Sequence, residues 1–206
     1  MHANVATDLR ELQDRLEAAE RDAKALVAGL SEEQGILRGQ SGGWSVAQCL
    51  DHLATGNRVY LGAMQEAAKR ARVRGRYRRR PARPGWVGRI FVWMFGPRVP
   101  RWFRLRAPRS IRPRAQASLA ETLASFLAAQ ADVRAFILAE ADLDLAGTRF
   151  RNPFVPGFRF SLATGLHIIT AHEIRHLEQA WRVRRAIELE LDDRPISAIR
   201  AHARED

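Results

Sequence analysis

The sequence predicts an all-α protein, a four-helix up-and-down bundle that carries one long arginine-rich insert between its second and third helices. Three observations support this class. Four long stretches repeat apolar residues at spacings of three and four, serines stand where two of those stretches begin, and no stretch shows the convincing alternation of a surface strand. Because 206 residues with 46% hydrophobic side chains suit one core, we expect a single domain over residues 1–206.

The first half of the chain contains two long helical patterns. Residues 7–30 place leucines and alanines along one helical face, and a short turn of helix is expected after Ser31, which begins a capping-box sequence. After a glycine-rich break, Ser45 is expected to cap the second long helix, with Gln48 as its reciprocal partner. That helix should run to about Arg70.

The second half contains the other two helical patterns. Residues 116–140 repeat leucine, phenylalanine and valine at helical spacing, and residues 142–160, which include Pro153, Pro156 and Gly157, are expected to form a loop. Ser161 should cap the last helix, which is expected to reach about Leu191. Residues 192–206 are expected to form a polar tail.

Residues 71–115 interrupt the helical pattern and form the predicted insert. They hold six of the nine prolines and three of the five tryptophans, and within them residues 86–95 could form a short apolar helix. Residues 67–120 contain no acidic residue but sixteen arginines and Lys69, so the net charge of +11 belongs to this segment. The remainder of the insert is expected to be irregular or extended.

Cysteine usage and the N-terminal sequence indicate where the protein works. Cys49 is the only cysteine, so no internal disulfide can form. Residues 1–10 lack the apolar segment of a secretory signal, and no run of uncharged apolar residues is long enough to span a bilayer. We therefore expect a cytoplasmic protein.

Three histidines suggest a metal site. His172 and His176 are four residues apart, so on a helix they project from one face, about one turn apart. His52, on the apolar face of the second helix, is the candidate third ligand, although a single histidine there is more often a packed core residue. Three imidazoles would leave one position on the metal for water or substrate. His167 lies on another side of the helix and is expected to be a bystander.

The same stretch also reads as H-E-x-x-H, the signature of zinc proteases in which the glutamate is the general base. The extended form of that signature needs glycine and histidine at the positions held by Gln179 and Arg182. Glu188 and Glu190, the other candidate third ligands, lie too far along the same helix. A protease is therefore disfavoured, and Glu173 is instead expected to be an exposed helical residue paired with neighbouring basic groups.

Several residues near the candidate ligands could assist them. Gln179 lies on the ligand face, where it could orient a bound water or an imidazole, or simply lie at the bundle edge. Cys49 could approach the metal, but a structural apolar role is favoured. Arg175 could meet an anionic substrate or be solvated, whereas Trp44 and Trp181 are expected to be packing residues.

Two stretches together resemble a known family. These are GWSVAQCLDHL at 43–53 and HEIRHLEQ at 172–179. The pattern, Trp-Ser before a helix bearing one histidine and then H-x-x-x-H-x-x-Q on the last helix, resembles the DinB-like superfamily, which includes YfiT-like members. The order and number of helices over residues 7–190 are also similar, whereas the arginine-rich insert departs from the family's pattern.

The resemblance implies a site for zinc or nickel at His52, His172 and His176. Characterised members of the superfamily include thiol S-transferases that use bacillithiol and a mycothiol-dependent maleylpyruvate isomerase. By analogy, the chain would be a metal-dependent enzyme, a thiol S-transferase or a hydrolase, acting on a small thiol and an electrophile, and dimers are common among relatives. The alternative is a non-catalytic metal-binding protein whose working surface is the basic insert.

The insert itself suggests an anionic partner. Basic residues flank an aromatic and apolar stretch within residues 76–106, a composition that suits the surface of an anionic membrane. Nucleic acid is disfavoured, because the sequence has neither a recognition-helix motif nor an RNA-binding signature. The competing interpretation is that the apolar piece packs over an open end of the bundle, with the arginines solvated around it.

Overall fold

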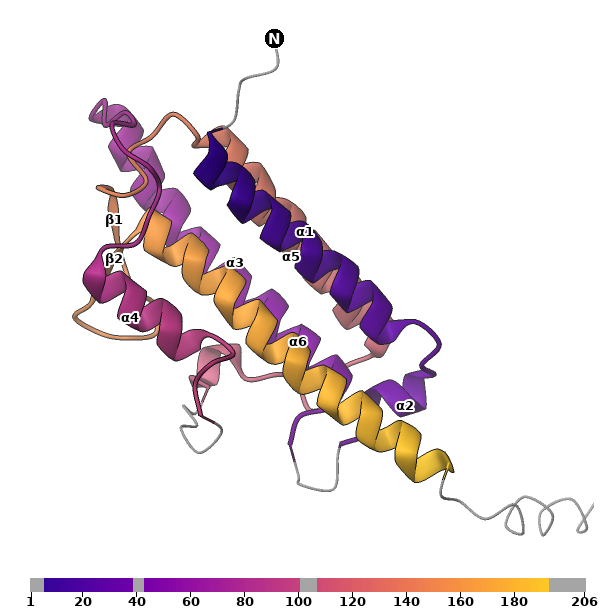
Figure 1. Ribbon diagram of the computed structural model, residues 1–206. Coiled ribbons are helices and arrows are strands. Elements are labelled where there is room, and N and C mark those ends of the chain that lie inside the picture. The colour runs from indigo at the N-terminus through magenta and orange to yellow at the C-terminus, as the bar shows by residue number, and fades with distance from the viewer. Residues whose placement is uncertain (1–5, 39–42, 101–106, 193–206) are drawn as a thin grey trace, which may run out of the picture.

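The structure, a computed structural model, describes residues 6–38, 43–100 and 107–192 (Figure 1). Its elements in chain order are α1 (Thr7–Val27), α2 (Glu32–Ile36), α3 (Val46–Val73), α4 (Trp86–Phe95), the 3-10 helix η1 (Arg109–Ile111), α5 (Leu119–Ala139), β1 (Arg149–Arg151), β2 (Arg159–Ser161) and α6 (Leu162–Asp192). The described residues are mostly helical with one small sheet, so the predicted all-α class is confirmed. The expected polar tail lies, after Asp192, outside the described residues.

Side-chain caps begin three of the helices at the predicted serines. Ser45 Oγ accepts a hydrogen bond from the Gln48 N–H at 3.1 Å, and the Ser45 N–H donates to Gln48 Oε1 at 3.3 Å, which completes a capping box for α3. Ser31 forms the same kind of box at α2. Ser161 Oγ accepts from the Thr164 N–H at 3.1 Å at the start of α6. These bonds satisfy backbone donors that a helix start would leave unpaired.

The four long helices pack around one axis. In the described residues α5 and α6 each pack against both α1 and α3, which places α1 and α3 diagonally opposite (Figure 1). Arg58 of α3 bonds Ser125 of α5, and Arg72, further along α3, bonds Ala139 at the end of α5. α3 and α5 therefore run parallel, because the long insert returns the chain to the end where α3 began. The up-and-down order that the sequence predicted is thus wrong for these two helices, since a long crossover rather than a short loop joins them.

The interior between the four long helices contains a polar layer between two apolar clusters. One cluster is centred on residues such as Leu16 and Ile169, and the other on residues such as Phe126 and Leu177. Between them lie three buried polar side chains from three different helices, Asn57, Gln130 and Glu173. Since a buried polar group is costly unless it is hydrogen-bonded, this layer fixes how the helices align along their length.

A short hairpin replaces the loop that the sequence predicted at 142–160. β1 and β2 pair antiparallel, with Phe150 opposite Phe160, and both rings are buried. Each strand has only three residues, too few for an alternating pattern to stand out from a loop. β2 leads directly into α6, so the hairpin covers the upper end of that helix and of α3 (Figure 1).

The insert contains the predicted short helix, α4, which packs along α6 (Figure 1). Gly88 faces α6, and a Cβ atom there would collide with the side chain of Thr164. Only glycine therefore allows this close approach. At the start of the insert, Arg78 is ion-paired with Asp8 of α1 at 2.7 Å. The part of the insert that the structure describes is thus fastened to the neighbouring helices. Apart from α4 and η1, most of its described residues have no regular structure, as expected.

α5 is the one described helix that is long and apolar enough to cross a membrane. The core helix of a globular protein meets the same criteria of length and composition. α5 packs against α1 and α3, and its Phe126 and Val133 side chains are fully buried. Its apolar character is thus explained by its place in the core.

Candidate metal centre

Three histidines from two helices converge at one point of the bundle. His52 extends from α3, and His172 and His176 extend from successive turns of α6. One nitrogen of each ring lies within 4.8 Å of the corresponding nitrogens of the other two. The Nε2 atoms of His52 and His172 are 3.2 Å apart. Two ligands of a tetrahedral zinc ion are separated by about 3.3 Å, so the donors could hold such a metal.

Hydrogen bonds on the far sides of two rings determine which nitrogens remain available. His52 Nδ1 lies 2.7 Å from the carbonyl oxygen of Ile111, which can only accept, so this nitrogen carries a proton. His176 Nδ1 lies 3.0 Å from Gln179 Oε1 and is protonated for the same reason. In the neutral rings, both Nε2 atoms therefore keep a lone pair for a metal.

Burial keeps these rings neutral. It lowers the pKa of His52, and it lowers the pKa of His172 well below its ordinary value, with the neighbouring histidines adding to the effect. Burial and then the charge of His52 lower the pKa of His176 to about 3. Neutral imidazole is the form that binds a metal, so the protein presents three ligands ready to coordinate near neutral pH.

Aromatic rings line two sides of the histidine cluster. The Trp44 ring lies 4.6 Å from the His52 ring and 5.6 Å from the His176 ring, the latter stacked, between ring centroids. Trp44, expected to be a packing residue, therefore also shields the ligands from water. Phe95, at the end of α4, lies 6.2 Å from His172. Its contribution was missed, because nothing in the sequence shows which way the insert folds back.

Of the other candidate site residues, one contacts a ligand ring and the rest have other surroundings. Gln179 contacts His176 directly, as described above. Arg175 donates a hydrogen bond to the carbonyl oxygen of Met94 in α4, at 3.1 Å. Cys49 is fully buried in the apolar cluster that contains Phe126 and Leu177, where burial raises the pKa of its thiol to about 12. His167 lies 3.3 Å from the Ala82 carbonyl oxygen and is not a member of the cluster.

Glu173 is not the exposed residue that the sequence suggested. Its side chain is fully buried and accepts hydrogen bonds from Asn57 Nδ2 at 2.7 Å and Gln130 Nε2 at 3.2 Å. Burial raises the pKa of this carboxyl to about 8, despite the two amide donors. The expectation failed because Glu173 follows His172 on α6, and that side of the helix faces α3 and α5 rather than solvent.

The position of Glu173 bears on the zinc-protease alternative. A general base must be ionised and directed at the reacting water, whereas this carboxyl is largely protonated at neutral pH and held in the polar layer. Glu188, one of the candidate third ligands, is ion-paired with Arg184 at 2.7 Å, further along α6. The geometry therefore provides no support for protease chemistry.

The arginine-rich insert supplies the bond that orients His52. Asp51 is buried next to His52 in the chain, and it accepts hydrogen bonds from the Arg114 backbone N–H at 2.8 Å and the Arg114 side chain at 3.1 Å. These bonds hold the returning end of the insert against α3, close to where the Ile111 carbonyl meets His52 Nδ1. In the sequence, Asp51 directly before His52 was the available signal that His52 has a supporting contact. The spacing of residues could not show that Arg114 is the partner of Asp51.

A cavity of about 180 Å³ lies beside His172. Apart from that histidine, its wall has no charged side chain and is mainly aromatic and aliphatic, with contributions from α3, α4, η1, the loop after β1, and α6. The lining residues are Gly56, Asn57, Tyr60, Phe95, Pro108, Ile111, Phe154, Val155, Ile168, Ile169 and His172. A small apolar molecule bound there would contact a candidate metal ligand.

Comparison with known proteins gives one match. A family model described as "DinB superfamily" matches residues 15–180, a range that includes the three histidines. No curated protein and no solved structure matches the chain.

Proposed function

The chain belongs to the DinB superfamily, and from that premise we propose that it is a metal-dependent enzyme that transfers a small thiol to an electrophile. The proposed ligands of a divalent metal are His52, His172 and His176. One observation carries the proposal. Two Nε2 atoms face each other at 3.2 Å, and the ring proton of His52 is already committed to Ile111, so a proton of His172 or a cation must lie between them.

Zinc or nickel is the proposed metal. Imidazole suits both, and the described part of the cluster contains no carboxylate or thiolate that would favour magnesium or copper(I). The proposal also takes the four long helices as a bundle of the DinB type, with residues 71–115 as its insert. The parallel course of α3 and α5 supports this, because it requires one long crossover.

The metal would supply Lewis acidity, which holds a thiol in its ionised form near neutral pH. The chain's own residues do the rest. Gln179 and the Ile111 carbonyl orient two ligand rings, Trp44 excludes water from them, and the apolar cavity holds the electrophile beside His172. The thiol loses its proton to solvent, its sulfur bonds to a carbon of the electrophile, and the leaving group departs with the electron pair.

Metal analysis of untagged protein tests the site. We expect about one zinc or nickel per chain in the unaltered protein and strongly reduced metal in His52→Ala and His172→Ala. His167→Ala is the matched control, since it removes a partly buried histidine outside the cluster. Stoichiometric metal in folded His52→Ala would remove His52 from the site.

Activity requires a separate measurement. The probe reaction is the consumption of chlorodinitrobenzene, a compact aromatic electrophile, in the presence of bacillithiol or mycothiol. We expect the reaction in the metal-loaded protein and its loss in folded His172→Ala. If metal binds stoichiometrically but neither thiol reacts, the transferase proposal is wrong and the proposed metal site is retained.

The second candidate is a non-catalytic protein whose metal is structural. It is favoured by the position of the ligands, since a metal there would join α3 to α6. In that case, removing the metal would lower the melting temperature without abolishing any reaction. Hydrolysis, with water in place of the thiol, would be a variant of the enzyme proposal. A cytoplasmic location is part of that proposal and is supported by a single, buried cysteine.

A further inference from the structure

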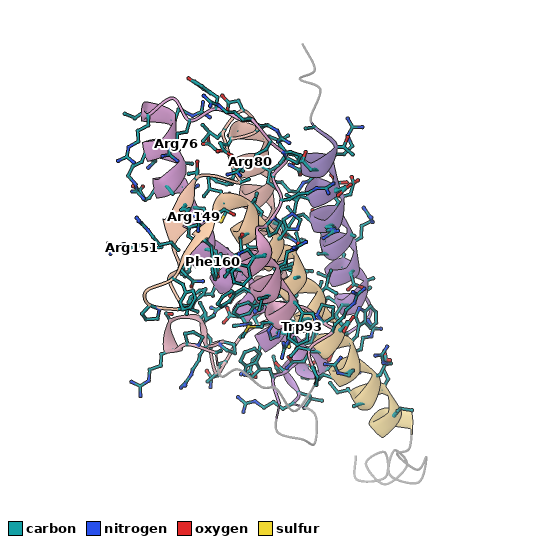
Figure 2. The ribbon with its side chains drawn as sticks, turned by 60° about the vertical axis from the view of Figure 1, so that its left-hand side comes forward. Arg76, Arg80, Trp93, Arg149, Arg151 and Phe160 are labelled. Atoms are coloured by element: carbon teal, nitrogen blue, oxygen red, sulfur yellow. The ribbon has the colours of Figure 1, made fainter. Side chains whose placement is uncertain are left out.

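The outer face of α4 exposes large apolar side chains to solvent. Trp86 is 71% exposed, Trp93 is 52% exposed and Ile90 is 49% exposed. In the view of Figure 2, which brings α4 and the hairpin forward, Trp93 lies on this side of the molecule. Scattered apolar residues are normal on a surface, but three on one short helix form a patch that needs an explanation.

Their spacing shows that the patch is a stripe. At 3.6 residues per turn, Trp86, Ile90 and Trp93 fall within an arc of roughly 60° of the helix. The opposite side of α4 is already occupied, since Phe91 and Phe95 pack against the core and Gly88 is buried against α6. The competing expectation, that this apolar segment simply packs over the bundle, therefore accounts for only one of its two sides.

Arginines lie near the end of the stripe that Trp86 occupies. Arg83 and Arg89 come from the insert, while Arg149, Arg151 and Arg159 come from the hairpin, some sixty residues further along the chain. All five are exposed, and none forms an ion pair with a carboxylate among the residues that the structure describes. The hairpin arginines were not part of the basic surface expected at 76–106, because only folding brings them beside α4.

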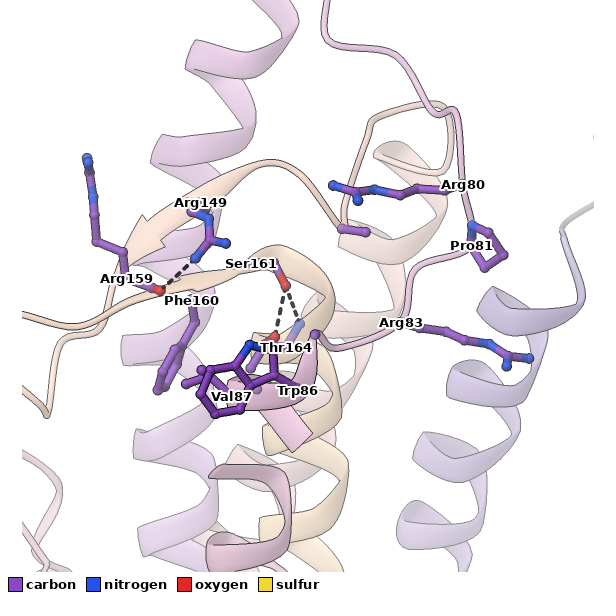
Figure 3. Close-up of a pocket in the computed structure, with 13 residues that line it drawn as sticks. Arg80, Pro81, Arg83, Trp86, Val87, Arg149, Arg159, Phe160, Ser161 and Thr164 are labelled. Carbon is purple, nitrogen blue, oxygen red and sulfur yellow. Dashed lines mark hydrogen bonds between the residues drawn. The ribbon is translucent and has the colours of Figure 1, made fainter. Parts of the chain in front are cut away.

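The two features meet in a hollow of about 400 Å³ between α4 and the hairpin (Figure 3). Trp86 and Val87 form one side of it, and Arg80, Arg83, Arg149 and Arg159 are among the residues around it. Of these arginines Arg80 has a nearby carboxylate, that of Asp144 at 3.6 Å. A cationic hollow bordered by an indole ring suits a phosphate group attached to an apolar chain.

We propose that the outer face of α4 and the adjoining hairpin arginines dock onto an anionic lipid bilayer. α4 would lie in the plane of the interface, with Trp86, Ile90 and Trp93 at the level of the headgroups and the arginines on lipid phosphates. Two further occupants fit less well. A second copy of the chain docked symmetrically would bring two sets of arginines together, and nucleic acid does not account for the exposed isoleucine.

Vesicle flotation with the full chain tests the proposal. We expect binding to vesicles of phosphatidylcholine mixed with phosphatidylglycerol, weaker binding when salt is raised, and little binding to phosphatidylcholine alone. Arg149→Gln/Arg159→Gln should lower the partition coefficient by roughly fivefold for each arginine removed. Trp86→Gln/Trp93→Gln should abolish stable binding and leave the helix content unchanged, because both side chains are exposed.

A charge-matched control is available on α1. Arg10→Gln/Arg21→Gln removes two exposed arginines from a helix on the other side of α6 from α4 and should bind like the unaltered protein (Figure 1). Equal binding of all variants, or no preference for anionic vesicles, overturns the proposal. A different outcome also overturns it. The unaltered chain would fail to bind vesicles, and the same substitutions would instead weaken self-association or binding to an oligonucleotide.

Discussion

His52 Nδ1 lies 2.7 Å from the carbonyl oxygen of Ile111, so a residue of the insert orients a candidate metal ligand on the second long helix. The position of that carbonyl depends on Asp51, which binds Arg114 three residues further along. The arginine-rich segment thus belongs to the candidate metal centre as well as to the surface of the protein.

Asp51→Ala should therefore weaken metal binding although Asp51 is not a ligand. The substitution removes two hydrogen bonds to Arg114 and should let the Ile111 carbonyl move away from His52 Nδ1. Partners of this kind typically change metal affinity by about 10- to 100-fold. Competition with a chelator measures the affinity, and an unchanged value in a folded variant would show that Ile111 is held without Asp51.

Gln179→Ala should also lower metal affinity, by about tenfold or more, because His176 loses the acceptor for its Nδ1 proton. Gln179→Glu keeps an acceptor oxygen and should recover most of the affinity. A helix-packing role alone would predict a lower melting temperature with unchanged affinity. Chelator competition and thermal unfolding of both variants separate the two explanations.

Gly88→Val should displace α4 from α6. The added side chain would collide with Thr164, and overpacking of this kind costs about 1–3 kcal/mol. Gly62→Ala is the matched control, since no atom lies near the position of its Cβ and the change should stabilise α3 by roughly 0.5–1 kcal/mol. Urea unfolding measures whether each substitution raises or lowers the free energy of unfolding. Equal stability of Gly88→Val and the unaltered chain would contradict the close packing of α4 on α6.

Cys49 should resist alkylation in the folded protein. Its thiol is fully buried and burial raises its pKa from 9.0 to about 12, so at pH 9 the folded protein keeps a proton that the unfolded chain partly loses. The associated stability is present below pH 9 and is lost as the pH rises toward 12. Mass spectrometry after iodoacetamide treatment, with and without urea, measures the protection. Rapid labelling without urea would place the thiol at the surface.

Asp8 should make stability depend on acid pH. Burial alone would raise its pKa, but hydrogen bonds from the Ala82 N–H and from Arg78 lower it below 3.8. A lowered pKa in the folded state stabilises the protein above pH 3.8, and this contribution is lost as the pH falls through the folded value. In Asp8→Asn the loss of stability on acidification should be smaller. If the free energy of unfolding fell by the same amount in both proteins as the pH was lowered, this prediction would be contradicted.

Much of the fold could be predicted because its signals are local. Ser45 and Gln48 are three residues apart and satisfy each other's backbone groups, so the start of α3 can be predicted from a few neighbouring residues. His172 and His176 share a helix face for the same reason. Three-residue strands carry no comparable signal, and Trp86, which lines the same hollow as Arg149 and Arg159 of the hairpin, belongs to another element.

By itself, the sequence determined the helical segments, the caps and the pairing of two histidines on the last helix, because these depend on residues within one or two turns of each other. Tertiary structure decided that His52 meets that pair, that Glu173 is buried in a polar layer, and that Ile111 orients His52. It also placed Arg149 and Arg159 of the hairpin beside the exposed Trp86 of α4. These relationships join residues far apart in the chain, whose approach depends on how whole helices pack and on the path of the insert.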